Sequence, residues 1–431
     1  MVLKLKYGDS YTQAKLRLKA PLVELKPRRV TSLQCSADLL SRSLDRSVGS
    51  YPARRLFRRA RNLLIVLPQN NWRGQAVAAL NALLASLRQA HVLDKEVKIL
   101  LAGRRRVPLN RSQIIQFFGE EIFERYQIFQ HDATDQAQLE FVGETHSGTP
   151  IFLNKHILDA DEIILCSPIA PHPLLGYSGG PSVIVPDCAG EVTIARLYDQ
   201  ALDAKGKVHK RCTDCSTEGN PIQESIRESL RFISARFGFY VVFNHNNGLV
   251  SAFSGHPFQA FAAGLEIVDS LSVVDIERQA DATIVSPGGA PHDNRFIDAV
   301  PALLRALRST RPGGAVFLSA ACQQGFGYNG FRNSTSSNGS FLNESPNQLS
   351  GIEEKLMRTL LAEYSRRNHI FCVSQLPEPL GHLEEIQHYT SLQEALDKGL
   401  PQEARPELVY LINDGVFTVP LYSAVNRGIH V

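Results

Sequence analysis

Short apolar runs alternate with longer amphipathic segments along most of the chain, and this alternation predicts an α/β protein. Runs rich in Leu, Ile and Val that end at turn residues are typical of parallel strands buried on both faces. In chain order they are 63–67, 97–102, 161–169, 240–243, 282–285, 315–320, 369–374 and 408–413. Helical spacing dominates between most of them, so we expect mainly parallel sheets covered by helices.

A restart of the strand and helix alternation after 267–274 predicts a boundary between two domains. A chain of 431 residues is also longer than one average domain. We therefore predict an N-terminal α/β domain over 1–267, joined by 406–431, and a C-terminal α/β domain over 268–405. The stretch 329–350 is dense in Asn, Ser and Gly, which predicts a long loop, either mobile or a lid.

The loop after the apolar run 161–169 carries the main candidate chemistry. His172 comes directly after this predicted strand, and Ser178, Gly179 and Gly180 follow in a glycine-rich turn. Glycines let backbone N–H groups approach an anion, and open α/β sheets bind ligands at the carboxyl ends of their strands. The same residues are equally compatible with an ordinary turn between a strand and a helix.

Two other predicted strands end in polar, mostly basic loops. The loop after 63–67 contains Asn70, Trp72 and Arg73, and the loop after 97–102 contains Arg104, Arg105 and Arg106. Parallel strands end at one edge of their sheet, so these loops are expected to converge with the glycine-rich turn. Arginines there favour a phosphate or carboxylate ligand, although solvated faces explain the wider Arg-rich segments 54–61 and 104–111 more simply.

Composition adds few constraints. The net charge of +3 does not indicate a nucleic-acid or membrane partner. The first residues lack the features of a signal peptide, and no apolar run is long enough to span a bilayer, so we expect a soluble cytoplasmic protein. Seven cysteines, an odd count, suit a reducing compartment.

Two local motifs leave a functional and a structural interpretation open. Cys212 and Cys215 form a single CxxC, compatible with a zinc or redox site or with two free thiols in a loop. His131 and Asp132 could be a base with its orienting carboxylate, but adjacent side chains usually point different ways. A turn or capping role is therefore favoured for that pair.

The order of these motifs resembles the nickel-dependent lactate racemase family along the whole chain. The family's Pro-His and Gly-Phe-Ser-Gly-Gly landmarks look like Pro171-His172 and Gly176-Tyr177-Ser178-Gly179-Gly180, its Asp-x-Thr-Arg loop like Asn70 to Arg73, its Gly-x-His-Arg loop like Gly103 to Arg106, and its later motifs like Gly219-Asn220-Pro221, Gly288-Gly289-Ala290-Pro291 and Asp293. The resemblance implies two α/β domains with an active site in the interdomain cleft. It also implies a nickel pincer nucleotide that takes a hydride from a 2-hydroxy acid, with two histidines as acid and base.

Several of the family's active-site residues are replaced here. By resemblance, His172 stands where one catalytic His belongs and Arg73 where the substrate-binding Arg belongs. Arg105 replaces the other catalytic His, and arginine cannot act as a general base because it stays protonated. Ser182 replaces the Lys that tethers the cofactor, and Tyr198 looks like the position of a nickel-ligand His.

The resemblance assigns further positions to the cofactor and the substrate. The cofactor positions would be Asn70, Trp72, Ser178, Gly179, Gly180 and Ser182. The segment 297–301 lacks the family's polar substrate contacts. Whether the chain uses any cofactor is therefore left open, and we predict that nickel is not bound stoichiometrically.

Two hypotheses follow from the retained and the lost residues. In the first, the protein is a diverged isomerase that acts on a 2-hydroxy acid or a related anionic metabolite, with His172 as acid or base and with Arg73 and Arg105 on the anion. In the second, it is a non-catalytic protein that binds an anion or a mononucleotide and has kept the fold. The retained His172 favours the enzyme.

Overall fold

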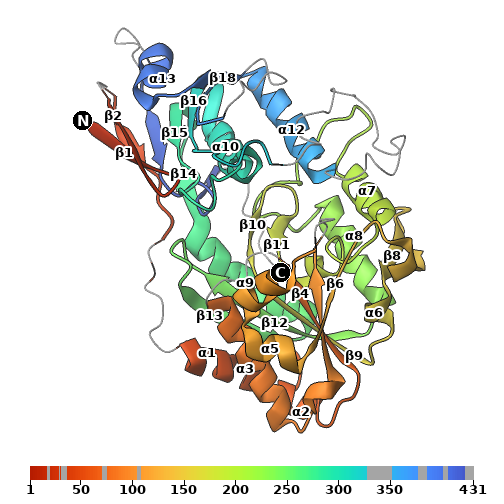
Figure 1. Cartoon of the computed structure of the whole chain (residues 1–431). Coiled ribbons are helices and arrows are strands. Elements are labelled where there is room, and N and C mark those ends of the chain that lie inside the picture. Colours follow the sequence, from red (N-terminus) through yellow and green to blue (C-terminus); the bar gives the residue numbers. More distant parts are fainter. Residues whose placement is uncertain are drawn as a thin grey trace.

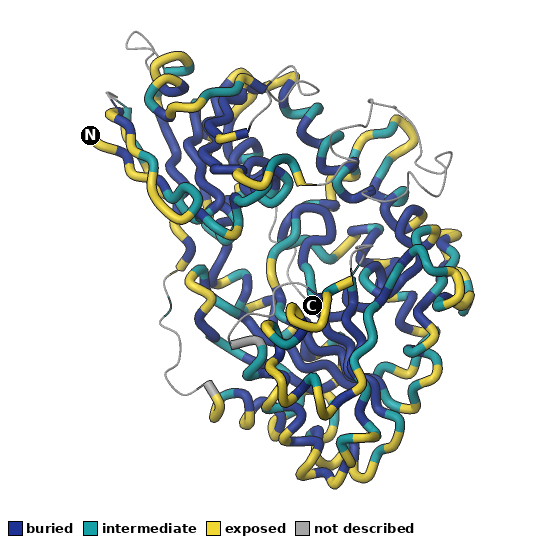
Figure 2. The backbone as a smooth tube through the Cα atoms, viewed as in Figure 1, coloured by how far each residue is buried: buried dark blue, intermediate teal, exposed yellow. Residues whose placement is uncertain are grey.

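Two lobes, each built around a six-stranded sheet, make up the molecule in the computed structural model (Figure 1). The structure describes residues 1–16, 20–28, 30, 36–69, 75–103, 108–327, 352–376, 386–400 and 406–422. Both sheets are mainly parallel, which confirms the predicted α/β class. The central strands of both sheets are buried, and most exposed residues lie on helices, on loops and on the N-terminal hairpin (Figure 2).

The first sheet has the strand order β13-β12-β9-β4-β5-β6, with only β13 antiparallel to its neighbour. Its strands are β4 (Leu63–Pro68), β5 (Val97–Ala102), β6 (Gln127–Gln130), β9 (Glu162–Pro168), β12 (Ala235–Phe243) and β13 (Leu249–Gly255). Successive side chains of β4 enter different cores: Leu63 and Ile65 pack on one face, Leu64 and Val66 on the other. A strand that is apolar at every position can pack against the cores on both faces of the sheet.

Helices cover both faces of the first sheet. They are α1 (Ser36–Asp45), α2 (Ala53–Leu56), α3 (Gln75–Gln89), α4 (Arg111–Phe118), α5 (Glu120–Arg125), α6 (Lys155–Leu158), α7 (Glu191–Asp199), α8 (Pro221–Ser229) and α9 (Pro257–Ser272). Core residues of α1 and α3 pack on one face, and those of α7, α8 and α9 belong to the core on the other. Small hairpins are added by β7 (Leu139–Glu144) with β8 (Pro150–Asn154), and by β10 (Ala170–His172) with β11 (Gly176–Ser178).

The second sheet has the order β18-β17-β16-β15-β19-β3 and is parallel throughout. Its strands are β3 (Leu22–Glu24), β15 (Ala280–Val285), β16 (Thr310–Ser319), β17 (His369–Val373), β18 (Ile386–Tyr389) and β19 (Val409–Ile412). One face packs on the hairpin of β1 (Val2–Tyr7) and β2 (Ser10–Lys15) and on α13 (Leu392–Gly399). The other face packs on α10 (Phe296–Ser309) and α12 (Ile352–Ser365).

Strand pairing at the two ends of the chain differs from the predicted domain membership, which placed both ends with the first lobe. β3 pairs with β19, and β19 pairs with β15, so both strands belong to the second sheet. Hydrogen bonding along β15 and a shared core fix this arrangement. A boundary at 267/268 stays a prediction, and α9 continues across it to Ser272. Close beyond α9, β14 (Val273–Ile276) pairs with β20 (Val419–Tyr422).

Two other expectations can be placed against the described residues. The predicted long loop over 329–350 lies outside them. Within them, no helix is both long and apolar enough to cross a membrane.

Candidate functional site

His172 lies at the carboxyl end of the first sheet, in the hairpin that follows β9. It closes this hairpin as the last residue of β10, with Gly176 as its partner on β11. A Cβ on Gly176 would lie 2.1 Å from the carbonyl oxygen of Ser216, so the tight turn requires glycine there. The imidazole Nδ1 accepts the backbone N–H groups of Leu174 at 3.2 Å and Leu175 at 3.1 Å. A ring nitrogen that accepts has no proton, so Nε2 carries the proton of the neutral ring.

That Nε2 proton is donated to a carboxylate from the second lobe. His172 Nε2 lies 2.9 Å from Glu353 Oε1, and the Tyr198 hydroxyl donates to Glu353 Oε2 at 2.7 Å. The Tyr198 side chain is fully buried on α7, and only 10% of the Glu353 side chain is exposed. Figure 1 shows α12, which carries Glu353, next to α7. One carboxylate therefore joins the two lobes at His172.

A second buried carboxylate fixes the hairpin around His172. Asp214 accepts from Arg305 Nη2 and from Arg308 Nη1, both at 2.7 Å. Arg305 Nη2 also reaches the carbonyl of Pro171 at 3.4 Å, and Arg308 Nη2 that of Pro173 at 3.3 Å. Both arginines lie on α10 of the second lobe. The residues on either side of His172 are thus held from across the junction of the lobes.

At Asp214, the two neighbouring arginines together outweigh the effect of burial on the pKa. Burial by itself would raise the pKa of Asp214, but Arg305 and Arg308 favour the ionised form and leave that pKa below its ordinary value. Only 2% of the Arg305 side chain is exposed. Its Nη1 also donates to the carbonyls of Gly415, at 3.0 Å, and Val416. The Arg305 guanidinium therefore has a carboxylate partner and backbone carbonyl acceptors.

The CxxC motif has a structural role in this arrangement, since Asp214 stands between its cysteines. Cys212 and Cys215 are free thiols. Burial raises the pKa of Cys212 to about 12, and its Sγ donates to Asn220 Oδ1 at 3.6 Å. Burial likewise raises the pKa of Cys215. Neither thiol has the lowered pKa of a reactive cysteine. Over the described part of the chain, no three His, Cys, Asp or Glu side chains are grouped to hold a metal ion.

The glycine-rich turn uses part of its backbone internally. The Gly180 N–H donates to Ser167 Oγ at 2.8 Å, so it is not free to bind an anion. A Cβ on Gly180 would lie 2.2 Å from Cδ2 of Phe261, and close packing therefore explains this glycine. Ser182 donates through its hydroxyl to the carbonyl of Gly179 at 3.0 Å, and the Ser178 hydroxyl donates to the carbonyl of Ala170 at 3.3 Å.

Four predicted site residues lie outside the described residues: Asn70, Trp72, Arg73 and Arg105. The strands that lead into their loops can be placed. β4 pairs with both β5 and β9, and all three run in the same direction. Their carboxyl ends therefore share the edge of the sheet from which the His172 hairpin emerges. The roles of the four residues stay predictions.

His131 and Asp132 have the structural roles that the sequence favoured. The buried imidazole of His131 bonds the carbonyl of Ala189 through Nε2 at 3.0 Å and accepts from Asn154 Nδ2 at 3.2 Å. Burial lowers its pKa to about 4, so the ring is neutral at physiological pH. Asp132 accepts the N–H of Thr134 at 2.8 Å, which closes a local turn.

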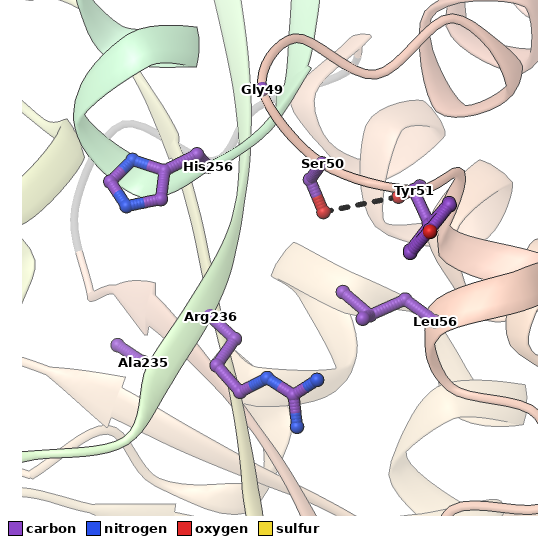
Figure 3. Close-up of a pocket in the computed structure, with 7 residues that line it drawn as sticks. All are labelled: Gly49, Ser50, Tyr51, Leu56, Ala235, Arg236 and His256. Carbon is purple, nitrogen blue, oxygen red and sulfur yellow. Dashed lines mark hydrogen bonds between the residues drawn. The ribbon is translucent and has the colours of Figure 1, made fainter.

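A surface hollow of about 510 Å³ lies away from this site (Figure 3). It is lined by Ser50, Tyr51, Arg236 and His256, among others. Arg236 is the second residue of β12, so the hollow lies at the amino end of that strand, and His172 follows the carboxyl end of the neighbouring parallel strand β9. Arg236 is also paired with Glu162 at 3.1 Å. The hollow contains none of the predicted site residues.

The residues present do not fit the pincer cofactor that the resemblance implies. At the tether position, Ser182 has no amine, and its hydroxyl donates to the carbonyl of Gly179. At the position of the nickel ligand, the Tyr198 hydroxyl donates its proton to Glu353. A phenol that keeps its proton is a poor metal ligand, because it must ionise to bind the metal well.

Comparison with known proteins gives consistent relatives. Residues 7–207 match the family model described as lactate racemase N-terminal domain. A lactate racemase of Thermoanaerobacterium thermosaccharolyticum is 26% identical over 294 residues, 68% of each chain. A lactate racemase of Lactiplantibacillus plantarum is 25% identical over 389 residues, which cover 88% of this chain and 89% of that one.

Two solved structures share the fold. The lactate racemase apoprotein from Thermoanaerobacterium thermosaccharolyticum matches with a TM-score of 0.80 at 21% identity, over 98% of this chain and 100% of that chain. A protein from Thermotoga maritima matches with a TM-score of 0.61 at 14% identity, over 90% and 97% of the two chains. The first match extends the likeness beyond the N-terminal region to both lobes.

Proposed function

Because this chain belongs to the lactate racemase family, we propose that it is a diverged isomerase that acts on a 2-hydroxy acid or a related anionic metabolite between its lobes. The observation that carries the proposal is the hydrogen bond between His172 and Glu353 at the junction of the lobes. An imidazole with a carboxylate partner is a common acid–base unit.

Each residue has a role in this proposal. His172 is the acid or base: Nε2 carries the proton of the neutral ring, so the ring takes a proton from the ligand at Nδ1, in exchange for the N–H groups of Leu174 and Leu175, and returns it from there. Arg73 and Arg105 hold the anionic group of the ligand, since guanidinium pairs with carboxylate in a two-pronged way. Arg305 and Arg308 are positioning residues that hold the hairpin of His172. The proposed chemistry is proton transfer at His172, and it uses no hydride step.

Isotope exchange tests this proposal directly. The protein would be incubated in D2O with single enantiomers of several 2-hydroxy acids and with 2-oxo acids, and exchange or inversion would be followed by NMR. We expect exchange in at least one compound and its loss in His172→Gln. His146→Gln is the matched control, because His146 is an exposed histidine paired with Glu228 on the surface. Equal exchange in both variants would exclude His172 as the acid or base.

A non-catalytic anion- or nucleotide-binding protein is the second candidate. It is favoured by the fact that both ring nitrogens of His172 are already hydrogen-bonded. In that case no compound exchanges with D2O, yet calorimetry detects a carboxylate or a nucleoside monophosphate. Binding should then fall by more than about threefold in Arg73→Ala and in Arg105→Ala, since losing a charged hydrogen bond costs about 1.5 kcal/mol or more.

A further inference from the structure

A fully buried carboxylate lies at the carboxyl end of the second sheet. Asp293 follows the loop after β15 and is 0% exposed, and among the described residues no cationic side chain pairs with it. We propose that Asp293 and Ser319 bind a monovalent alkali cation, sodium or potassium, beneath the hairpin of β1 and β2. The site belongs to the second lobe, and the inference does not depend on the activity proposed for His172.

The two oxygens of the Asp293 carboxylate have different surroundings. Oδ2 accepts the backbone N–H of Gly8 at 2.8 Å and that of Ala321 at 3.1 Å. Oδ1 is buried and has no hydrogen-bond partner in the part of the chain that the structure describes. An ionised Asp293 leaves a buried negative charge uncompensated, and a proton on Oδ1 has no acceptor there. Either form is costly unless another group binds Oδ1.

The ionisable side chains nearby do not supply a positive charge to Asp293. Lys6 pairs with Asp414 at 2.5 Å. Burial lowers the pKa of His292, which favours its neutral ring. Burial, with the neighbouring thiols and carboxylate, raises the pKa of Tyr7, so the phenol keeps its proton. Buried charges in proteins are paired or coordinate metal ions, and a bound cation therefore explains this carboxylate.

Ser319 brings a second buried oxygen to the same end of the sheet. It is 0% exposed, and its Oγ has no hydrogen-bond partner among the described residues. Phe317, two residues earlier on β16, packs in the core beneath the hairpin, so Ser319 points to that face as well. A Cβ on Gly8 would lie 3.3 Å from Cβ of Ala321, which places the end of the hairpin directly over this strand end. The Oγ of Ser319 and Oδ1 of Asp293 therefore face the same layer between sheet and hairpin.

The neighbouring strands add further oxygens to this layer. β15 pairs in register with β16 and with β19, which places Ser286 and Asn413 in the same row as Ser319. The Ser286 hydroxyl donates to the carbonyl of Lys6 at 2.6 Å and thereby ties the row to β1. Asn413 Oδ1 is another buried oxygen that lacks a hydrogen-bond partner within the described residues. Oxygen atoms are the ligands that hard cations prefer.

A single positive charge suits this site better than a double one. Asp293 contributes one negative charge, and Ser319 contributes a neutral oxygen. Calcium and magnesium sites usually combine several carboxylates or keep several waters, which a fully buried layer does not supply. An alkali cation balances Asp293 and is coordinated by both oxygens. It would join the end of β16 to the loop that precedes α10, the helix that carries Arg305 and Arg308.

Urea unfolding of the full chain in sodium, potassium and choline chloride, at equal ionic strength, tests the proposal. Choline is too large to fit between two buried oxygens. We expect the equilibrium constant of unfolding to be about tenfold lower in sodium or in potassium than in choline, as for a ligand at about ten times its Kd. The salt that gives the larger shift identifies the cation that the site prefers.

Ser319→Ala separates a bound cation from an ordinary buried hydroxyl. In choline the variant should be at least as stable as the wild type, because it removes a buried hydroxyl that lacks a partner. In the preferred cation it should be less stable than the wild type, and the difference between salts should shrink below about threefold. Asp293→Asn should lose this difference too. Asp281→Asn is the matched control and should keep it, because Asp281 lies at the amino end of the same sheet and pairs with Arg311.

Equal stability of the wild type in all three salts would overturn the proposal. A folded Ser319→Ala that keeps the full difference between salts would overturn it as well, and this variant decides the matter even if Asp293→Asn does not fold. The isotope-exchange experiment reports on His172, so either proposal can fail while the other stands.

Discussion

Two buried carboxylates join the lobes beside His172, and they differ in what faces them. Asp214 lies between two guanidinium groups, whereas Glu353 accepts from a neutral imidazole and a phenol. Parting a buried pair of charges leaves each one uncompensated, so the contact at Asp214 is fixed. The same chemical group thus joins the lobes through ion pairs with two guanidinium groups at one position, and through hydrogen bonds with His172 and Tyr198 at the other.

The largest expected effect on stability is at Asp214. Asp214→Asn leaves the charges of Arg305 and Arg308 buried without their counter-ion, and should lower the free energy of unfolding by about 3–5 kcal/mol. Urea unfolding followed by circular dichroism would measure this loss. A loss below about 1 kcal/mol would show that Asp214 does not carry the buried charge pairing with the two arginines.

His131 is a buried imidazole that stays neutral, and the pH dependence of stability tests the cost of charging it. The pKa of His131 is lowered from 6.5 to about 4 by burial. The unfolded chain therefore takes up a proton between pH 6.5 and 4 that the folded protein does not, and stability falls as the pH is lowered. The loss from this residue reaches at most about 3 kcal/mol. It fades as the pH rises above 6.5.

His131→Gln keeps a donor and an acceptor but cannot titrate. Its free energy of unfolding should therefore decline less than that of the wild type between pH 7 and 5. Parallel declines in the two proteins would show that His131 is not the group responsible.

The hydrogen bond between Tyr198 and Glu353 should cost less to break. Tyr198→Phe removes the hydroxyl that donates to Glu353 and should lower the free energy of unfolding by about 1–2 kcal/mol. In a double-mutant cycle with Glu353→Gln, the two changes should couple by at least about 0.5 kcal/mol, because the residues are in contact. Additive effects would show that the hydroxyl of Tyr198 and the carboxylate of Glu353 do not interact.

The smallest effect belongs to an ion pair in water. Asp38 and Arg42 pair one turn apart on α1, with both side chains largely exposed. Asp38→Asn should change the free energy of unfolding by less than about 0.5 kcal/mol, since solvent screens exposed pairs. It is the matched control for Asp214→Asn, being the same substitution without burial.

Much of the fold follows from the sequence, because a strand buried on both faces must be apolar at every position. The runs 63–67 and 97–102 show this and lie in β4 and β5 as predicted. β3 is only three residues long and mostly exposed, so it leaves no such pattern. Its place depends on pairing with β19, at the other end of the chain, which no local pattern encodes.

Some residues of the candidate site could likewise be predicted from the sequence, and others could not. His172 could be predicted from its position after a strand, and the structure places it in a built hairpin. Glu353 was missed because acidic residues are common in the first turn of a helix, where they need no function. Arg305 did carry a readable sign: it stands among Leu303, Leu304 and Leu307 on a helix whose apolar face is buried. A charge in that setting requires a partner, and the sequence could not say which one.

The pairing of β3 with β19 also affects the order in which the protein folds during its synthesis. Leu22 meets Val409, and almost the whole chain separates them. At a synthesis rate of about 5–20 residues per second, the ribosome releases the second partner some tens of seconds after the first. During that interval β19 has not yet been made, so water or a chaperone can bind the backbone groups of β3. The second lobe therefore closes last, although its first strand is among the earliest residues to be made.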